Sequence, residues 1–529
     1  MTPAPDSPRP RRARPPLSLP GSAVRRLGAR LLDPDTAVRR ADDEGLEPTI
    51  YRADTLLVPG VVGGSADQAV SGLDELAKRM GYAVELVERE PSLGPLAREH
   101  GLLKELDALG HTAVRLTVRE GAVVPTPDAW LFLQTARAEG FLGSEGIGLA
   151  HAMTASGWWD GIGWWDGIGW WDGIGQGGAG GSSGGAGSGR SGGGSGGRVP
   201  VVWSGPPLVV GPDDGWPQTR DSGVRAPVVV TLDTGLGRHP WFPDGPTVER
   251  DPRVDGRPIG LRFAPGEDAE VDGSTLGLVN GGLDPLAGHG TFIAGLIRQH
   301  CPSAVIVSAP VMYGDGVADE VDVVEALTSL WLRQRLATAP GGNADDAIDV
   351  ITLSLGYHHE RGAQVNDEEA LFRVLRALSE AGVVIVAGSG NDASEAEFMP
   401  AAYAARVTGA PMVSVGALNP DGQTVAVYSN TGDWVQTYRP ATHVVSTMPT
   451  SFDSTTRGDL LAAPDGLPRR GTPDPDDFSG GFGLWSGTSF AAPALAGQVA
   501  AAMCREGAKA GDPVERATHA VADALGGAR

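Results

Sequence analysis

The sequence has 529 residues and a formal net charge of −23 at pH 7. This length suggests about two to four domains with a sizeable core, and the acidic balance argues against nucleic acid or an anionic membrane as the main partner, since both require a basic face. No apolar run reaches the roughly 18 to 20 residues of a membrane span. With only Cys301 and Cys504 present, a disulfide scaffold is excluded and a reducing compartment is favoured.

The first 48 residues are rich in proline and arginine and predict a disordered basic tail. Its Arg25-Arg26 pair is followed by LGARLLDPD, which is too short and too charged to be the apolar part of a signal peptide. We therefore expect a cytoplasmic protein, with export by another route left open.

Residues 49–156 are expected to form a small α+β accessory domain. DTLLVPG, YAVELVE and HTAVRLTV are typical of strands, whereas SADQAVSGLDELAKRM and TPDAWLFLQTARAEG have the periodicity of helices. No cluster of catalytic side chains can be assembled within this part of the sequence.

Residues 157–197 contain three copies of WWDGIG followed by a Gly/Ser tract. A period of six residues matches neither a helix nor a strand, and the glycines make ordering costly, so this segment is predicted to be a flexible tether. Its exposed tryptophans are large apolar surfaces, which usually indicate a binding partner. Duplication of a tolerated linker unit is the alternative, and both interpretations remain open.

Residues 198–529 are expected to form the main domain, in which short apolar strands alternate with long helical patterns from Ala226 onward. APVVVTLDTG, SAVIVSAPV, IDVITLSLG, VVIVAGSGN and PMVSVGAL predict strands, and GTFIAGLIRQH, ADEVDVVEALTSLWLRQRLAT and EEALFRVLRALSEAG predict helices. This alternation predicts an α/β fold with a mainly parallel sheet that helices cover on both faces. Such sheets bind their ligands at the carboxyl ends of the strands.

Three residues of this domain have the chemistry of a nucleophilic site. Asp233 follows the strand VVVTL, His289 lies between two glycines at the start of a helix, and Ser489 opens the helix that contains Pro493, which we expect to be tolerated near the first turn. A serine needs a histidine to remove its proton, and the histidine needs a carboxylate to fix its tautomer. Each segment alone also fits a plain turn or a helix cap, but together they predict a catalytic triad.

The segments VVVTLDTG, GHGTFIAGLI and SGTSFAAPALAG resemble the active-site motifs of the subtilisin-like serine proteases, the subtilase or peptidase S8 family. The resemblance covers about residues 226–510. It implies a subtilisin-like fold and a serine endopeptidase in which Asp233, His289 and Ser489 form the triad.

The same resemblance implies two further elements of the site. Asn391 in VVIVAGSGNDAS is expected to complete the oxyanion hole, with a plain Asx turn as the alternative. Ser354, Leu355 and Gly356 in ITLSLGY are expected to pair with an extended substrate peptide, unless this segment is simply another core strand.

The segments before the protease have competing interpretations. Residues 49–156 loosely resemble the small prodomains that inhibit proteases of this family, and a domain that binds a partner is the alternative. We expect the WWDGIG segment to bind in the protease cleft of the same chain, either as an inhibitor or as a substrate that is cut. The rival hypothesis is a peptide precursor or binding scaffold centred on WWDGIG. Because no triad member is lost, we favour an active enzyme.

We expect no metal and no cofactor. The loop over residues 451–482 is rich in Gly, Pro and Asp, but its spacing matches no defined calcium loop. Asp221 and Asp233 both fit the D-[ST]-G pattern of aspartic proteases, but they are too close in sequence to come from two lobes. The expected partners are peptide or protein substrates, with residues 157–197 of the chain itself as a candidate.

Overall fold

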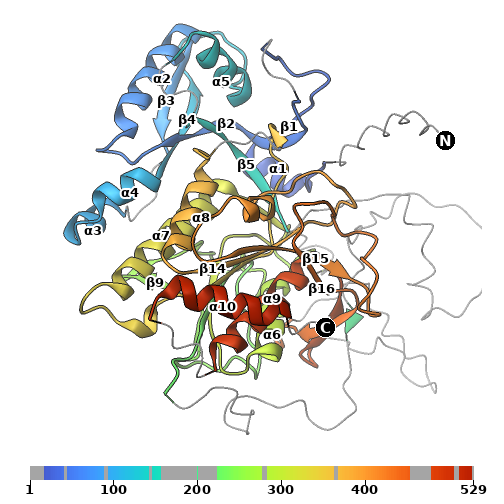
Figure 1. The fold of residues 1–529 in the computed structure, drawn as a ribbon. Coiled ribbons are helices and arrows are strands. Elements are labelled where there is room, and N and C mark those ends of the chain that lie inside the picture. The colour runs from blue at the N-terminus through green and yellow to red at the C-terminus, as the bar shows by residue number, and fades with distance from the viewer. Residues whose placement is uncertain are drawn as a thin grey trace, which may run out of the picture.

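The computed structural model describes residues 17–40, 45–87, 93–141, 146–155, 199–200, 223–276, 283–362, 367–452, 478–505 and 511–526. The WWDGIG repeats with the Gly/Ser tract, and most of the loop predicted over residues 451–482, lie outside these described residues. The described chain forms an N-terminal α+β part and a larger α/β part (Figure 1).

The N-terminal part is built on an antiparallel sheet of strand order β12-β5-β2-β4-β3, with β1 added to β2. Helices α2 and α5 pack on it around a hydrophobic core of its own, which includes Leu56, Leu73 and Phe132. The strands and helices expected from the sequence are present, and β5 is an additional strand. The elements are α1 Gly21–Leu27, β1 Ala29–Leu32, β2 Thr49–Pro59, α2 Ala66–Met80, β3 Tyr82–Leu86, α3 Gly94–Glu99, α4 Leu103–Leu109, β4 His111–Val118, α5 Ala129–Ala138 and β5 Gly148–Thr154.

The prediction of a disordered tail up to residue 48 does not hold for α1 and β1. Ala23 and Leu27 of α1 are buried, and the guanidinium of Arg26 lies 2.7 Å from the carboxylate of Asp315 in the α/β part. Strand β1 pairs with β2 in antiparallel register. The apolar residues and this ion pair order a segment whose composition alone suggested disorder.

The α/β part is built on a parallel sheet of seven strands in the order β16-β15-β14-β13-β7-β11-β8. All six residues of the central strand β7 are buried, as expected for a strand that has helices on both of its faces. The predicted α/β class is therefore confirmed. The strands are β7 Val228–Asp233, β8 Val248–Glu249, β11 Val305–Pro310, β13 Val350–Leu353, β14 Val384–Gly388, β15 Met412–Leu418 and β16 Thr437–Pro440.

Helices cover the two faces of this sheet in separate groups. α6, α9 and α10 lie on one face, whereas α7 and α8 lie on the other, between the sheet and the N-terminal part (Figure 1). Among the described helices, none is long and apolar enough to cross a membrane. Their bounds are α6 His289–His300, α7 Glu320–Thr338, α8 Ala370–Glu380, α9 Thr488–Met503 and α10 Pro513–Gly526.

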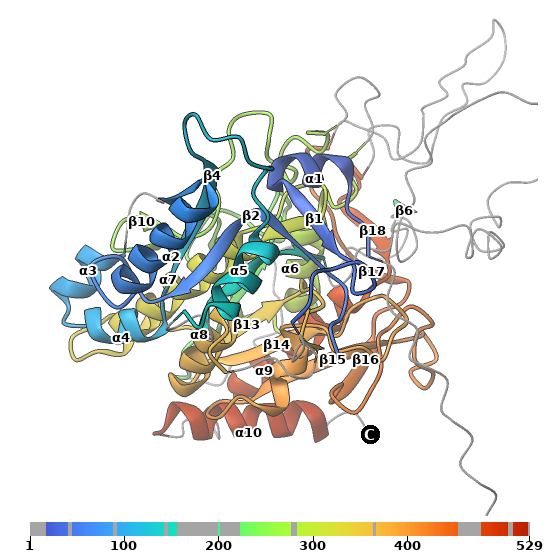
Figure 2. The ribbon, with the colours of Figure 1, turned by 90° about the horizontal axis from the view of Figure 1, so that it is seen from above.

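Short strands complete the α/β part, and one of them joins it to the N-terminal sheet. β12 pairs in antiparallel register with β5, so that a strand of the α/β part forms the edge of the N-terminal sheet. The view from above shows the N-terminal part lying over α7 and α8 (Figure 2). The short strands are β6 Val199–Pro200, β9 Arg253–Val254, β10 Arg257–Pro258, β12 Val317–Asp319, β17 Val444–Thr447 and β18 Phe482–Trp485.

Candidate active site

Asp233 and His289 are in direct contact. Asp233 is the last residue of β7, His289 is the first residue of α6, and both are buried. The Nδ1 atom of His289 lies 2.7 Å from Oδ1 of Asp233, and the backbone N–H of Thr234 donates to the same oxygen at 2.8 Å. A carboxylate at Nδ1 favours the tautomer in which Nδ1 carries the proton, which leaves Nε2 to act as a base.

The glycines on either side of His289 are required by close packing. Gly288 has φ 82°, and a Cβ atom on it would lie 2.5 Å from Met448 Cε. A Cβ atom on Gly290 would lie 2.1 Å from the carbonyl oxygen of Gly235, in the turn after Asp233. The GHG segment thus lets the start of α6 approach the end of β7 closely enough for their side chains to meet.

Ser489 lies in the first turn of α9, and its position depends on Pro493. Pro493 is the sixth residue of the helix and lies in its second turn, slightly later than the position near the first turn that was expected from the sequence. It has no N–H to donate to the carbonyl oxygen of Ser489, which accepts a hydrogen bond of 2.8 Å from the hydroxyl of Ser354 instead. Phe490, the next residue after Ser489, packs against the ring of His289 with centroids 5.3 Å apart.

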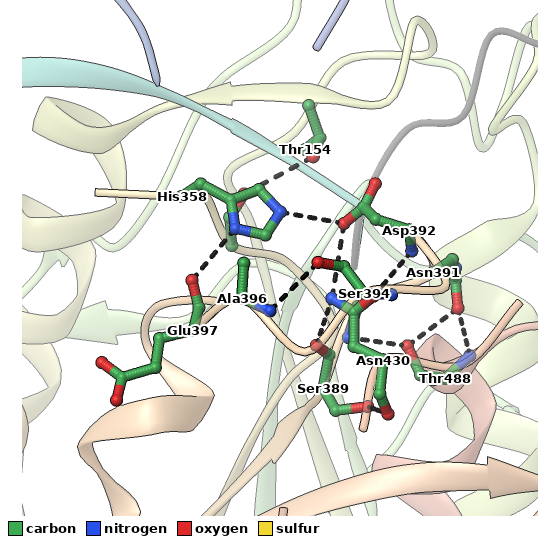
Figure 3. A network of polar contacts seen from close by, with 12 residues as sticks. Thr154, His358, Ser389, Asn391, Asp392, Ser394, Ala396, Glu397, Asn430 and Thr488 are labelled. Atoms are coloured by element: carbon green, nitrogen blue, oxygen red, sulfur yellow. Dashed lines mark hydrogen bonds and ion pairs between the residues drawn. The ribbon is translucent and has the colours of Figure 1, made fainter. Parts of the chain in front are cut away.

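Asn391 follows β14 and is oriented by Thr488. Its Oδ1 accepts hydrogen bonds of 2.9 Å from both the N–H and the hydroxyl of Thr488, which directly precedes Ser489 (Figure 3). This network assigns the oxygen of the amide to Thr488 and leaves the NH₂ group to face elsewhere. Asn391 is therefore not only a turn residue, because its side chain ties the end of β14 to the start of α9.

A second polar network beside Asn391 was not anticipated from the sequence. Asp392 Oδ2 lies 3.1 Å from Nε2 of His358, whose Nδ1 lies 3.0 Å from the carbonyl oxygen of Glu397 (Figure 3). Oδ1 of Asn430 accepts from the N–H of Asp392 at 2.9 Å, and its NH₂ group donates to the carbonyl oxygen of Ser389 at 2.9 Å. These bonds fix the loop that carries Asn391.

Glu270 is a buried carboxylate beneath Asp233 and His289, and no sequence motif pointed to it. The hydroxyl of Thr234 donates to its Oε1, the N–H of Gly290 donates to the same oxygen at 3.0 Å, and the hydroxyl of Thr291 donates to Oε2 at 2.6 Å. Burial raises the pKa of Glu270 to about 8, although the hydrogen bonds from Thr234 and Thr291 act in the opposite direction.

The segment predicted to bind substrate is paired with the N-terminal part. Gly356 and Thr154 exchange two backbone hydrogen bonds, Thr154 N–H to Gly356 O at 2.7 Å and Gly356 N–H to Thr154 O at 2.8 Å. Leu355 is buried and belongs to the core. Thr154 lines a common pocket with Asp392 and Phe398, so the end of β5 reaches the immediate neighbourhood of Asn391.

His151 of β5 forms a buried ionic contact between the two parts. Its Nδ1 lies 2.6 Å from Glu320 and its Nε2 lies 2.9 Å from Glu360, both of which belong to the α/β part. Its ring stacks on Tyr357 with centroids 4.2 Å apart. Burial alone disfavours the charged imidazolium, but the two carboxylates, Glu320 first, outweigh it and raise the pKa of His151 to about 10.

His151, His359 and Glu360 also have the composition of a metal-binding group, with one ligand atom each within 4.8 Å of one another. A metal-ligating imidazole must offer an unprotonated nitrogen. Both ring nitrogens of His151 face carboxylate oxygens, and Nδ1 of His359 accepts a hydrogen bond of 3.0 Å from the N–H of Arg361. The group is therefore better described as an ion-paired imidazolium than as a ligand set.

Cys301 and Cys504 lie at the ends of the two helices that carry His289 and Ser489. Both thiols are buried, and their sulfur atoms are 3.6 Å apart. Residues that are distant in sequence are thus neighbours in the seam between α6 and α9.

Several proteins are similar to this chain. Subtilisin BL of Lederbergia lenta is 27% identical over 252 residues, which are 46% of this chain and 73% of that protein. The minor extracellular protease Epr of Bacillus subtilis (strain 168) is 30% identical over 183 residues, 34% of this chain and 25% of that protein. Among solved structures, fervidolysin of Fervidobacterium pennivorans, described as a keratinolytic enzyme related to subtilisin, has a TM-score of 0.43 at 15% identity and covers 88% of this chain and 56% of its own.

The sequence model of the subtilase family matches residues 225–522, which include all seven strands of the parallel sheet and the helices on both of its faces. This match covers more than half of the chain, so the resemblance stated from the three motifs is confirmed. The chain belongs to the subtilase family of serine-type endopeptidases.

Proposed function

We propose that the chain hydrolyses peptide bonds through an acyl-enzyme on Ser489. His289 removes the proton of the Ser489 hydroxyl as that oxygen attacks the substrate carbonyl, and then gives the proton to the leaving amine. Asp233 keeps the imidazole in the productive tautomer and stabilises the cation that forms. Water then attacks the acyl carbonyl while His289 takes its proton, and His289 returns that proton to the Ser489 oxygen as the ester bond breaks and the carboxylic acid product leaves. The observation that carries this proposal is the buried contact of 2.7 Å between Asp233 and His289.

The oxyanion is proposed to be bound by the NH₂ group of Asn391 together with a backbone N–H at the start of α9. The contacts of Oδ1 with Thr488 support this assignment, because they leave the NH₂ group to donate elsewhere. Donors that are oriented before the reaction stabilise the developing charge without reorganisation.

Replacement of Ser489 by Ala tests the nucleophile. Ser489→Ala is expected to abolish peptide hydrolysis and labelling by a fluorophosphonate, while the thermal unfolding temperature stays close to that of the wild type. Ser71→Ala is the control, because it removes an exposed hydroxyl on α2 whose only bond among the described residues is to the carbonyl oxygen of Asp67, and it is expected to remain labelled. Hydrolysis by Ser489→Ala at the wild-type rate would show that another residue is the nucleophile.

We further propose that the N-terminal part inhibits the protease in cis. Its strand β5 occupies the position in which an extended peptide would pair with Gly356, and it is held there by β12 on its other edge. Tethering within one chain gives such a segment an effective concentration on the order of millimolar. Thr154 lines one pocket with Asp392, the residue after Asn391, so the end of β5 lies close to the proposed oxyanion donor.

Self-cleavage shortly after Thr154, at the start of residues 157–197, would follow from this arrangement. Mass spectrometry of wild type and Ser489→Ala, incubated side by side, is expected to show a cut in this region only in the wild type. Replacing the six tryptophans from Trp158 to Trp171 by Ser tests whether the repeat is recognised, and fewer cuts are expected in that variant. Intact wild type, or the same fragments in Ser489→Ala, would refute self-processing.

A proline at position 154 tests the inhibition separately. Thr154→Pro removes the N–H that donates to Gly356 and is expected to weaken docking, so that hydrolysis of an added peptide starts without a lag. Thr154→Ala keeps the backbone bond and serves as the control. An equal lag in both variants would argue for a domain that binds another partner.

A further inference from the structure

We infer that Glu270 is a positioning residue of the triad, which holds the segments of Asp233 and His289 together and whose ionisation redirects the hydroxyl of Thr234 away from Asp233. This inference rests on the proposed triad and adds a residue that acts through it. Glu270 does not touch the reacting atoms, so it would change the rate through its effect on Asp233 and on the imidazolium that His289 forms during the reaction.

The first part of the argument is connectivity. Glu270 accepts from Thr234, the residue after Asp233, and from Gly290 and Thr291, the two residues after His289. One buried carboxylate thus receives donors from the end of β7 and from the first turn of α6. Loss of this group would leave the buried hydroxyl of Thr291 without its described acceptor and would remove the acceptor that Thr234 and Gly290 share, which is costly at a site that depends on the distance between the two segments.

The second part is a count of protons on the hydroxyl of Thr234. This oxygen lies 3.1 Å from Oδ1 of Asp233, contacts Oε1 of Glu270, and accepts from the N–H of Gly290 at 2.9 Å. A hydroxyl has a single proton to donate. When Glu270 is protonated, it donates to Thr234 and Thr234 donates to Asp233. When Glu270 is ionised, it accepts the hydrogen bond of the Thr234 hydroxyl, and Asp233 loses that hydrogen bond.

The groups around Glu270 determine the pH at which it ionises and the hydrogen bond of Thr234 changes its acceptor. Asp233 at the end of β7 and Asp268 on the loop of Glu270 are both acidic, and α6 presents the uncharged Gly290 and Thr291. Burial and these two carboxylates raise the pKa of Glu270 to about 8. Glu270 is therefore protonated below about pH 8 and becomes charged as the pH rises through this value.

Both consequences of ionisation stabilise the imidazolium form of His289 that develops during the reaction. A new negative charge beneath the imidazole favours its cation, and an Asp233 carboxylate with one hydrogen bond fewer is a stronger partner for that cation. Since the cation forms in the transition state, kcat should rise above pH 8. We expect a rise of about 3- to 10-fold between pH 7 and pH 9.

The experiment measures kcat and KM of the full chain on a peptide amide from pH 6 to 10, with rates expressed per site titrated by a fluorophosphonate. Glu270→Gln is expected to lose the step near pH 8 while KM stays within about twofold. The control is Asp284→Asn. Asp284 is a buried loop carboxylate whose described donors, Thr275 and Leu276, do not touch the triad, and this variant is expected to keep the step.

A second pair of variants decides the question if Glu270→Gln does not fold. Thr234→Val removes the hydroxyl that connects the two carboxylates and should make the step smaller, because only the charge of Glu270 then acts, whereas Thr234→Ser should retain the full step. A step that persists in Glu270→Gln, a step of wild-type size in Thr234→Val, or a loss of kcat that is equal at all pH values would overturn the inference. A wild type that hydrolyses the peptide without a step would overturn it as well and leave the proposed function intact, whereas a wild type without hydrolysis would overturn the proposed function itself.

Discussion

Replacement of His151 by Gln should release the N-terminal part from the protease in a manner that depends on pH. His151 lies between Glu320 on α7 and Glu360 in the segment after β13, with His359 and Tyr357 of that segment against its ring. Gln keeps a polar side chain in this place but carries no charge at any pH. The variant therefore removes the ion pair and retains most of the volume.

The magnitude follows from the pKa of His151, which is raised from 6.5 to about 10 in the docked chain. At about 1.4 kcal/mol per pH unit this corresponds to at most about 5 kcal/mol, and breaking a buried ion pair costs about 3 to 5 kcal/mol. We expect docking to weaken by about 10²- to 10³-fold at pH 7. Because the pKa is raised on docking, the contribution of His151 is fully present below pH 6.5 and is lost as the pH rises through about 10.

The assay is the rate at which a bulky fluorophosphonate labels Ser489 in the full chain. The rate in His151→Gln divided by the rate in the wild type should be on the order of 10² at pH 7 and should approach 1 near pH 10, since the wild type loses the charge of His151 as the pH rises through this value. The control is His111→Gln. Burial lowers the pKa of His111 to about 3, so it is neutral throughout this range and its ratio should not change with pH. The same pH-independent ratio in His151→Gln would refute the ionic contact as the cause of docking.

Three further substitutions test the site and its support. Asn391→Ala should lower kcat by about 10²- to 10³-fold with little change in KM, and an unchanged kcat would exclude Asn391 as an oxyanion donor. Gly290→Ala places a Cβ atom 2.1 Å from the carbonyl oxygen of Gly235 and should cost about 1 to 3 kcal/mol of stability together with most of the activity, whereas a wild-type melting temperature and rate would contradict the packing argument. Phe292→Ala removes a fully buried ring from α6 and should cost about 3 to 5 kcal/mol in denaturant unfolding, with a cost below about 1 kcal/mol as the contrary result.

The strands and helices of the α/β part could be predicted from the sequence because each is encoded by a local pattern of apolar residues. The buried strand that ends at Asp233 is a continuous apolar run, and parallel strands bring their carboxyl ends to one edge of the sheet. Candidates at the ends of strands and the starts of helices, such as Asp233 and His289, could therefore be expected to meet although they are far apart in the chain.

The elements that were missed depend on contacts between distant segments. β5 has almost no alternation of buried and exposed residues, since α5 and α7 contact it in addition to the strands β2 and β12 on its edges, and nothing in its sequence indicates these partners. Glu270 lies in an acidic loop whose sequence predicts exposure to solvent. Its burial follows from the fold, which brings Thr234 and Thr291 together around it. The part of the tail that forms α1 was misjudged because Arg26 suggests solubility, whereas its partner Asp315 is almost 300 residues away.

The cysteine pair can report on the opening of the seam between α6 and α9. Alkylation requires a thiolate, and the contact with Cys504 together with burial raises the pKa of Cys301 well above its usual range. Both sulfur atoms are buried at the C-terminal ends of α6 and α9, the helices that carry His289 and Ser489, so a reagent can reach them only when this end of the seam opens. The rate of alkylation in the native chain, divided by the rate in denaturant, then measures the free energy of that opening without any introduced label. A peptide bound in the cleft should slow this alkylation to the extent that it holds the two helices together.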